Sequence, residues 1–342
     1  MGEWLRRQGY TVYGLTRSLT SVAGEPSVER AAPAGSRIEV FGDLSDTARL
    51  LELIGQLRPD EVYHFGAQSD DQISFEAPEY TANITGLSTV RLLEAIRRFS
   101  PATKFFQASS AQLFWPAPPP QHEDSPMTPR SPYGAAKLYA THLTRVYRAT
   151  YGLFCCNAFL FNHESSRRQE RYVTRKITRG LARILAGQQE TLVLGNLQAR
   201  RDWGYAPEYI EVIWRQLQQP APEDLVIGSG TDHSIGEFVE AACGYVGLRP
   251  ERHVKTDARY VRDTEPWIMR ADISKAGRML GWTPKVGFED LVKVMLDADM
   301  QALGLDVIGD GLAAVRRAGL GWSVADFPEP STLPAGDQGT PS

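Results

Sequence analysis

The stretch Arg130-Ser131-Pro132-Tyr133-Gly134-Ala135-Ala136-Lys137 carries more information than any other part of this chain. The spacing of four between Tyr133 and Lys137 places both side chains on one face of a helix, about one turn apart. A lysine ammonium beside a phenol lowers the pKa of the phenol, because the positive charge favours the phenolate. Such a phenol can take a proton from a substrate hydroxyl while a hydride leaves the same carbon. Since this spacing also arises by chance in many helices, its interpretation depends on the surrounding sequence.

Short apolar runs alternate with longer helical patterns on both sides of this stretch. The runs resemble buried strands at 10–15, 37–41, 61–65, 104–108 and 154–161, and the helical patterns lie near 46–57, 79–99 and 131–150. This alternation predicts βαβ units, and therefore an α/β fold with a Rossmann-like, doubly wound parallel sheet over residues 1–161. Right-handed crossovers would bring the carboxyl ends of these strands together as one ligand-binding edge.

The pattern changes after about residue 160. Strand-like runs become sparser, and residues 162–305 mix helices with short strands, which predicts a smaller C-terminal α/β lobe that closes over the sheet edge and is mixed with parts of the first domain. Residues 323–342 are rich in Pro, Gly, Ser and Asp, and this composition predicts a disordered tail.

The composition argues against several classes of partner. The 342 residues carry a formal net charge of −4, which gives no reason to expect binding to nucleic acid or to an anionic membrane. No apolar stretch reaches membrane-spanning length, and the N-terminus lacks the apolar segment of a signal peptide. The three cysteines suit neither a disulfide framework nor a zinc site and predict a cytoplasmic protein. His163 and Glu164 lack a third ligand at useful spacing, so we expect no metal.

The beginning of the chain departs from a dinucleotide-binding sheet. Such a sheet starts with a strand, a glycine-rich turn and a helix, and the turn and the helix N-terminus hold the pyrophosphate. Here residues 3–8 resemble the end of that helix, and no Gly-x-x-Gly-x-x-Gly occurs in the first half of the sequence. The absent strand is central in the usual order, so a sheet that lacks it would be split. Either the sequence has lost its true start or the fold is compromised, and the coherent order of the later strands and helices favours the first.

Several longer runs agree with one another in order and spacing from about residue 3 to residue 300. The runs are His-Phe-Gly-Ala-Gln-Ser at 64–69, Gln-Ala-Ser-Ser at 107–110, the stretch 130–140, Phe-Asn-His-Glu-Ser at 161–165, Val-Thr-Arg-Lys-Ile-Thr-Arg at 173–179, Leu-Gly-Asn at 194–196, Arg-Asp-Trp-Gly at 201–204 and Leu-Gly-Trp at 280–282. In these runs the chain resembles the extended short-chain dehydrogenase/reductase family and, within it, the GDP-mannose 4,6-dehydratases.

The resemblance implies an enzyme with a bound NADP that is not consumed. Tyr133 would take the proton of the C4 hydroxyl of a nucleotide sugar while C4 gives up a hydride. The new ketone acidifies the C5 proton, water leaves from C6, and the hydride returns to C6. In this scheme Lys137 also holds the nicotinamide ribose, and Ser110 bonds the C4 oxygen.

Further residues take their roles from the same resemblance. Arg17 suits a 2′-phosphate, since a guanidinium pairs with phosphate through two bonds, and Asp43 and Leu44 match the family's adenine contact. Gly66, Ala67 and Gln68 would pass beside the cofactor. The nucleotide sugar, with GDP-mannose expected, would contact Asn162, Lys176, Arg201, Arg262 and Glu265. Alternatively, the basic segment 173–179 is an ordinary solvated helix face. A homodimer or homotetramer is also implied.

The sequence departs from the family pattern in three places. Gln112 replaces the glutamate that acts as the base for C5 and helps to expel the C6 hydroxyl, and an amide has no proton affinity near neutral pH. Phe114-Trp115 replaces Tyr-Gly and would place a bulky ring near the sugar pocket, and Asp70 replaces a histidine. Two alternatives therefore stay open. One is an NADP-dependent C4 epimerase or reductase, which Ser109-Ser110-Ala111 would serve well, and the other is a non-catalytic nucleotide-sugar-binding homologue.

Overall fold

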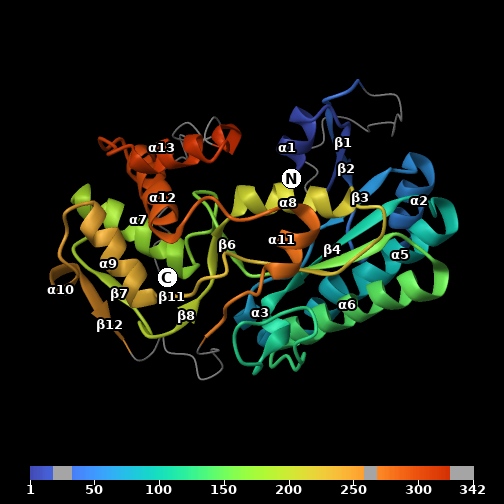
Figure 1. Cartoon of the computed structure of the whole chain (residues 1–342), viewed down its shortest axis with the longest axis horizontal. Coiled ribbons are helices and arrows are strands. Elements are labelled where there is room, and N and C mark those ends of the chain that lie inside the picture. The colour runs from blue at the N-terminus through green and yellow to red at the C-terminus, as the bar shows by residue number, and fades with distance from the viewer. Residues whose placement is uncertain (18–32, 258–267, 324–342) are drawn as a thin grey trace, which may run out of the picture. The chain divides into compact units, whose positions relative to one another are not determined.

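The computed structural model describes residues 1–17, 33–257 and 268–323. The chain forms two compact units. Unit 1 comprises Met1–His163, Arg200–Asp232 and Thr264–Pro284, and unit 2 comprises Glu164–Ala199, His233–Asp263 and Lys285–Ser342. The chain therefore passes several times between the two units (Figure 1). Of the expected tail at 323–342, Ser323 ends a short 3₁₀ helix, and the remainder lies outside the described residues.

Parallel strands form the centre of unit 1 (Figure 1). Strands β3 (Glu61–His64), β4 (Lys104–Ser110), β5 (Cys155–Leu160) and β10 (Leu225–Ile227) form a four-stranded sheet in the order β10-β5-β4-β3. Neighbouring strands of this sheet pair in parallel, with Gln107 opposite both His64 and Asn157. The fold class predicted from the sequence is confirmed. Strand β5 is one residue shorter at each end than the expected run 154–161.

Helices cover both faces of this sheet. Along β4 and β5, Phe105 and Cys155 pack with α2 (Thr47–Leu57), α5 (Ser88–Phe99) and α6 (Pro132–Tyr151). Their neighbours Phe106 and Cys156 point the other way, toward α8 (Ala206–Leu217) and α11 (Ser274–Leu280). Successive side chains of a strand point to opposite faces, so an uninterrupted apolar strand is one that is buried on both sides.

The sheet is split, as the sequence predicted. Strands β1 (Val12–Thr16) and β2 (Arg37–Phe41) pair in parallel as a separate two-stranded sheet, and no ladder among the described strands joins β1 to β3. Most positions of β1 and β3 are only half-buried, whereas all of β5 is buried. Helix α1 (Gly2–Arg7) precedes β1 and buries Trp4 and Leu5.

The expected helix over 79–99 is not one regular helix. It consists of α4 (Pro78–Thr81), the π-helix η2 (Ala82–Leu87) and α5. Gly86 in η2 lies against α6, where an added Cβ would sit 3.4 Å from the carbonyl oxygen of Ala136. A π-turn adds one residue to a helical turn and shifts the apolar pattern by one position, and so small a shift does not stand out within the apolar pattern of the sequence. Such turns are frequent at functional sites.

The remaining elements of unit 1 are short. They are α3 (Asp71–Glu76), η3 (Ala111–Phe114), β8 (Arg200–Arg201), β9 (Trp203–Tyr205) and the first two residues of β6 (Asn162–Glu164), whose Glu164 belongs to unit 2. Strand β6 pairs with β9.

Unit 2 contains helices and short strands. Its helices are α7 (Val173–Leu185), α9 (Ile235–Tyr245), α10 (Pro250–His253), α12 (Phe288–Ala302), α13 (Asp310–Arg317) and η5 (Gly321–Ser323). Its strands are β7 (Leu192–Leu194), β11 (His233–Ser234) and β12 (Val254–Thr256), and β7 pairs in parallel with β12. Helices α7, α9 and α12 pack against one another.

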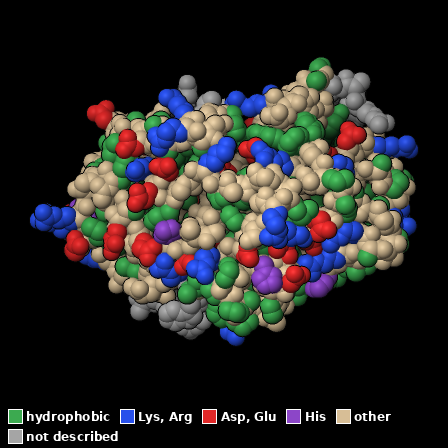
Figure 2. Space-filling model, viewed as in Figure 1, with side chains coloured by type: hydrophobic (Ala, Val, Ile, Leu, Met, Phe, Trp, Pro, Cys, Tyr) green, Lys and Arg blue, Asp and Glu red, His purple; other side chains and the backbone are tan. Residues whose placement is uncertain are grey.

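The surface carries both signs of charge. Figure 2 shows basic and acidic side chains interspersed over the face in view. None of the described helices combines the length and the apolarity that crossing a membrane requires. Within the described ranges, no three histidine, cysteine, aspartate or glutamate side chains lie together as a metal site would need.

Candidate active site

Helix α6 begins in a way that fixes the position of Tyr133. The hydroxyl oxygen of Ser131 accepts a hydrogen bond from the backbone N–H of Gly134 at 3.1 Å and so caps the helix. Pro132 occupies the first helical position, where its missing N–H has no consequence. Gly152 ends the helix in the left-handed region at φ 67°. Tyr133 therefore lies in the first turn.

The structure brings Tyr133 and Lys137 together, as the spacing predicts. The two side chains are buried, and the Lys137 ammonium lies 5.9 Å from the centre of the Tyr133 ring. The Lys137 Nζ donates a hydrogen bond to the carbonyl oxygen of Ala108 near the end of β4, at 2.7 Å. Burial lowers the pKa of Lys137 to about 8, because a charged ammonium loses hydration there.

This pKa predicts how the reaction rate depends on pH. In the role that the resemblance implies, Lys137 would support a phenolate at Tyr133 only while Lys137 is protonated, and burial holds the pKa of Lys137 below its usual value. The ammonium therefore predominates below pH 8 and is lost above it. We expect the rate of C4 oxidation to fall as the pH rises through about 8. Initial rates at constant ionic strength would measure this, and a rate that stays constant far into the alkaline range would contradict it.

Ser110 and Gln112 lie where β4 ends and η3 begins. The Ser110 hydroxyl oxygen accepts a hydrogen bond from the backbone N–H of Gln112 at 3.2 Å and caps η3. The Ser131 hydroxyl donates to the Gln112 Oε1 at 3.4 Å. The residue in the place of the family's glutamate is thus connected to the first turn of the helix that carries Tyr133.

The departures at Phe114 and Asp70 have local structural explanations. Phe114 is buried and packs on Phe159 at 5.1 Å between ring centres. Trp115 is half-buried, and its ring lies under the Arg130 guanidinium at 4.9 Å, so the expected bulky ring near the sugar pocket stays a prediction for Trp115 alone. The Asp70 carboxylate caps α3 by accepting hydrogen bonds from two backbone N–H groups.

Arg17 has a partner that sequence reasoning missed. Its Nη1 donates a hydrogen bond to the Tyr80 hydroxyl at 2.8 Å, and its Nε lies 3.9 Å from an Asp43 carboxylate oxygen. Hydrogen bonds from Ser45 hold the pKa of Asp43 below its usual value, and the charge of Arg17 adds to this. Arg17 and Tyr80 are 63 positions apart, and no local pattern in the sequence connects them.

The other residues expected at the cofactor form two neighbouring loops. A Cβ added at Gly66 would lie 2.5 Å from Cδ1 of Leu44, so a larger residue there would require the Leu44 side chain to move. The loop at Gln68 is held by Thr85 of η2, whose hydroxyl accepts from the Gln68 N–H at 3.0 Å. The loop at Leu44 is held by Arg91, which donates to the Leu44 carbonyl at 3.1 Å. Ala67, between Gly66 and Gln68, is half-buried.

His64 at the end of β3 is a structural residue. Its Nε2 lies 2.9 Å from the Ser88 hydroxyl, which itself donates to the Ile84 carbonyl. Burial lowers the pKa of His64 to about 3, and the positive charge of Lys137 contributes to this shift. A neutral imidazole is therefore the form present around neutral pH.

The residues expected to contact the nucleotide sugar are distributed over the chain. Asn162 on β6 and Arg201 on β8 belong to unit 1 and are half-buried, whereas Lys176 on α7 belongs to unit 2. Arg262 and Glu265 lie outside the described residues. The structure therefore does not test this set as a group.

The basic segment of α7 is not an ordinary solvated face. Asp299 on α12 is fully buried, and the Arg175 Nη2 approaches its carboxylate at 2.7 Å. Arg179 lies 3.6 Å from the same carboxylate, and Thr178 donates to it at 2.7 Å. The alternative of a solvated face is wrong for both arginines, because Asp299 draws them inward. Burial raises the pKa of Asp299, and hydrogen bonds from Arg175 oppose that rise.

Comparison with known proteins agrees with the geometry. The family model for GDP-mannose 4,6 dehydratase matches residues 1–295. The chain belongs to this family. GDP-mannose 4,6 dehydratase 1 of Arabidopsis thaliana is 46% identical over 312 residues, which cover 87% of this chain and 85% of the relative. The human GDP-mannose 4,6 dehydratase is 40% identical over 329 residues, which cover 89% of this chain and 88% of the relative.

Solved structures with lower sequence identity share the fold. RMD from Pseudomonas aeruginosa, solved in complex with NADPH, has a TM-score of 0.70 at 21% identity and covers 85% of this chain and 99% of its own. UDP-glucose 4-epimerase from Brucella ovis, in complex with NAD, has a TM-score of 0.73 at 22% identity and covers 90% of this chain and 94% of its own. At these identities the likeness establishes the Rossmann-like fold alone.

Proposed function

We propose that this protein is an NADP-dependent lyase, a GDP-mannose 4,6-dehydratase that converts GDP-mannose to GDP-4-keto-6-deoxymannose. The observation that carries the proposal is the family match over residues 1–295, in which Tyr133 and Lys137 lie side by side at the carboxyl edge of the sheet. Relatives that are 38–46% identical over most of the chain bear the name of this activity.

The relevant parts of NADP are the 2′-phosphate, the pyrophosphate and the nicotinamide ribose. The described residues fit the first and the third. Arg17, beside Tyr80 and Asp43, offers a guanidinium for a 2′-phosphate. Lys137, with Tyr133 beside it, would hold the nicotinamide ribose. The glycine-rich turn that holds the pyrophosphate in this fold is not among the described residues. When bound, NADP would accept a hydride from C4 of the sugar and return it to C6.

The side chains of this protein would carry out the proton transfers and the orientation. The Tyr133 phenolate accepts the C4 hydroxyl proton, and Lys137 stabilises the phenolate by its charge. The Ser110 hydroxyl orients the C4 oxygen. The cations Lys176, Arg201 and Arg262 would bind the diphosphate, with Asn162 and Glu265 beside the nucleotide sugar. Gln112 can donate and accept hydrogen bonds at C5 and C6 but cannot exchange a proton there.

The test is the mass of the product. Incubation of the purified protein with GDP-mannose and NADP should yield a nucleotide sugar that has lost one water, with no net reduction of the cofactor. A product of unchanged mass with an inverted C4 would instead establish a C4 epimerase, the candidate that Ser109-Ser110-Ala111 and Gln112 favour. A 4-keto product that keeps its C6 oxygen, formed together with one equivalent of NADPH, would indicate a C4 reductase working in reverse. Binding of GDP by calorimetry without binding of NADP would indicate a non-catalytic homologue.

A homo-oligomer, either a dimer or a tetramer, is part of the proposal. Leu87 on η2 and Tyr139 and Val146 on α6 are 40%, 43% and 49% exposed, and apolar side chains of this size gain by burial against a second copy. Light scattering would measure the molar mass, and a monomer would contradict this inference.

A cytoplasmic location also stays a prediction. The three cysteines, all free and buried, support it, and cell fractionation would test it.

A further inference from the structure

Polar contacts at intervals of about one turn attach helix α6 to the sheet. The first is the hydrogen bond from Lys137 to the Ala108 carbonyl at 2.7 Å. The second joins the hydroxyls of Thr141 and Ser109, also at 2.7 Å. The third is the ion pair of Arg145 with Asp224 at 2.6 Å. Positions 137, 141 and 145 follow the helical repeat and therefore lie along one face.

The second contact is buried and isolated. Thr141 is 0% exposed and Ser109 is 4% exposed. In the part of the chain that the structure describes, each hydroxyl is the only side-chain hydrogen-bond partner of the other. A buried hydroxyl that loses its partner costs about 1–3 kcal/mol. The pair therefore resists any sliding of α6 along β4.

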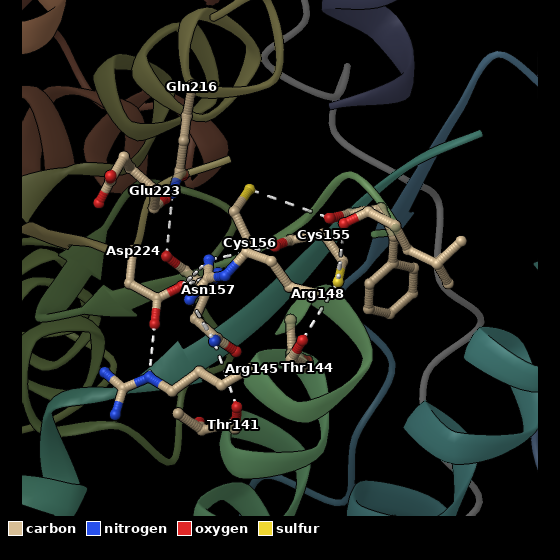
Figure 3. A network of polar contacts seen from close by, with 12 residues as sticks. Thr141, Thr144, Arg145, Arg148, Cys155, Cys156, Asn157, Gln216, Glu223 and Asp224 are labelled. Carbon is tan, nitrogen blue, oxygen red and sulfur yellow. Dashed lines mark hydrogen bonds and ion pairs between the residues drawn. The ribbon is translucent and has the colours of Figure 1, made fainter. Parts of the chain in front are cut away.

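The contacts beyond Thr141 extend the attachment to a third strand. Figure 3 shows Asn157 of β5 between Thr141 and Asp224. The Asn157 Nδ2 donates to the Thr141 carbonyl at 3.3 Å and to the Asp224 carboxylate at 3.1 Å. The same carboxylate accepts from Arg148 at 2.9 Å. Asp224 precedes β10, so α6 is attached to β4, β5 and the start of β10.

The position of Ser109 in the sequence connects this contact with the reaction. Ala108, the residue before it, accepts the hydrogen bond of Lys137, and Ser110, the residue after it, is the expected partner of the C4 oxygen. Thr141 lies one turn beyond Lys137 on the helix that also carries Tyr133. The hydroxyl pair thus joins β4, which carries Ser110, to α6, which carries Tyr133 and Lys137.

We propose that Ser109 and Thr141 are positioning residues for the C4 oxidation, and that their hydroxyl pair sets the register of α6 against the end of β4. The inference rests on the proposed function, because C4 oxidation is the step that it affects. Without the pair, Tyr133 and Lys137 keep their chemistry but lose their alignment with Ser110. Alignment errors of about 1 Å slow enzymes by roughly 10²-fold, and a partial loss of register should slow this step by about tenfold or more while the KM changes little.

The test separates positioning from stability by removing one hydroxyl or both. In Thr141→Val the Ser109 hydroxyl loses its partner, so both the melting temperature and kcat should fall. In the double variant Ser109→Ala/Thr141→Val neither hydroxyl remains, and removal of both partners is nearly neutral for stability. We expect the double variant to have a melting temperature close to that of the wild type. Its rate constant for C4 oxidation in a single turnover should be about tenfold lower. Thr141→Ser, which keeps a hydroxyl, should recover most of the rate.

Thr144→Val is the matched control. Thr144 is also buried on α6, but its hydroxyl donates only to the Ala140 carbonyl of the same helix at 2.9 Å. This variant should keep the wild-type kcat. If the stable double variant oxidises C4 at the wild-type rate, the positioning role is refuted while the proposed function stands. If the wild type itself forms no reduced cofactor with GDP-mannose, the proposed function fails, and the positioning role fails with it.

Discussion

Replacement of Tyr133 with phenylalanine is expected to slow the C4 oxidation of GDP-mannose by roughly 10²–10⁴-fold, the range typical for loss of a general base. The substitution removes one oxygen and leaves the ring, which is 9% exposed, in its place. Lys137 would keep its hydrogen bond to Ala108, so the helix and the neighbouring charge should stay where they are. The absorbance of reduced nicotinamide in a single turnover measures this step directly.

The control for this prediction is on the same helix. Tyr139→Phe removes an equivalent hydroxyl from a side chain that is 43% exposed, and it should leave the oxidation rate within about twofold of the wild type. Calorimetry with GDP-mannose should find nearly the same affinity for both variants. If Tyr133→Phe oxidised C4 at the wild-type rate, the phenol could not be the base, and the proposed mechanism would be refuted.

The features predictable from the sequence are those with a local physical cause. The alternation of apolar strands and helical patterns follows from burial of the sheet on both faces, as Phe105 and Phe106 demonstrate by packing on opposite helix layers. The two separate sheets followed from strand order, because no strand among the described residues takes the central place between β1 and β3. The pairing of Tyr133 with Lys137 followed from helical spacing.

The features missed by sequence reasoning depend on contacts between distant segments. No periodicity connects Arg17 with Tyr80 or Ser109 with Thr141, since these pairs form only after the elements have packed. The inward direction of Arg175 is likewise set by Asp299, which is 124 positions away. The charge of each residue in the run 173–179 can be read from the sequence, but the residue that each side chain contacts cannot. A π-turn in place of a regular helix at Ala82–Leu87 left no signal either.

The surroundings of Gln112 would accommodate a glutamate. The Ser131 hydroxyl donates to the Gln112 Oε1, and a carboxylate oxygen at the same place would accept this bond equally well. The backbone N–H of residue 112 is bonded to the Ser110 hydroxyl and does not depend on the side chain. An amide and a carboxylate have nearly the same shape. The difference between the two is therefore one of proton affinity and charge, and a single substitution can test it.

Gln112→Glu is expected to raise the rate of water loss from GDP-mannose by about 10²–10⁴-fold, because it supplies a group that can take the C5 proton and protonate the leaving C6 hydroxyl. The rate of C4 oxidation should change little, since the proposed mechanism assigns that step to Tyr133 and Lys137. Mass spectrometry of the product and the exchange of C5 hydrogen with deuterated solvent would measure the two stages separately. Gln72→Glu, the same substitution on the exposed side of α3, controls for the added charge. If Gln112→Glu left dehydration unchanged while C5 exchange was already fast in the wild type, another group of this protein would have to be the base.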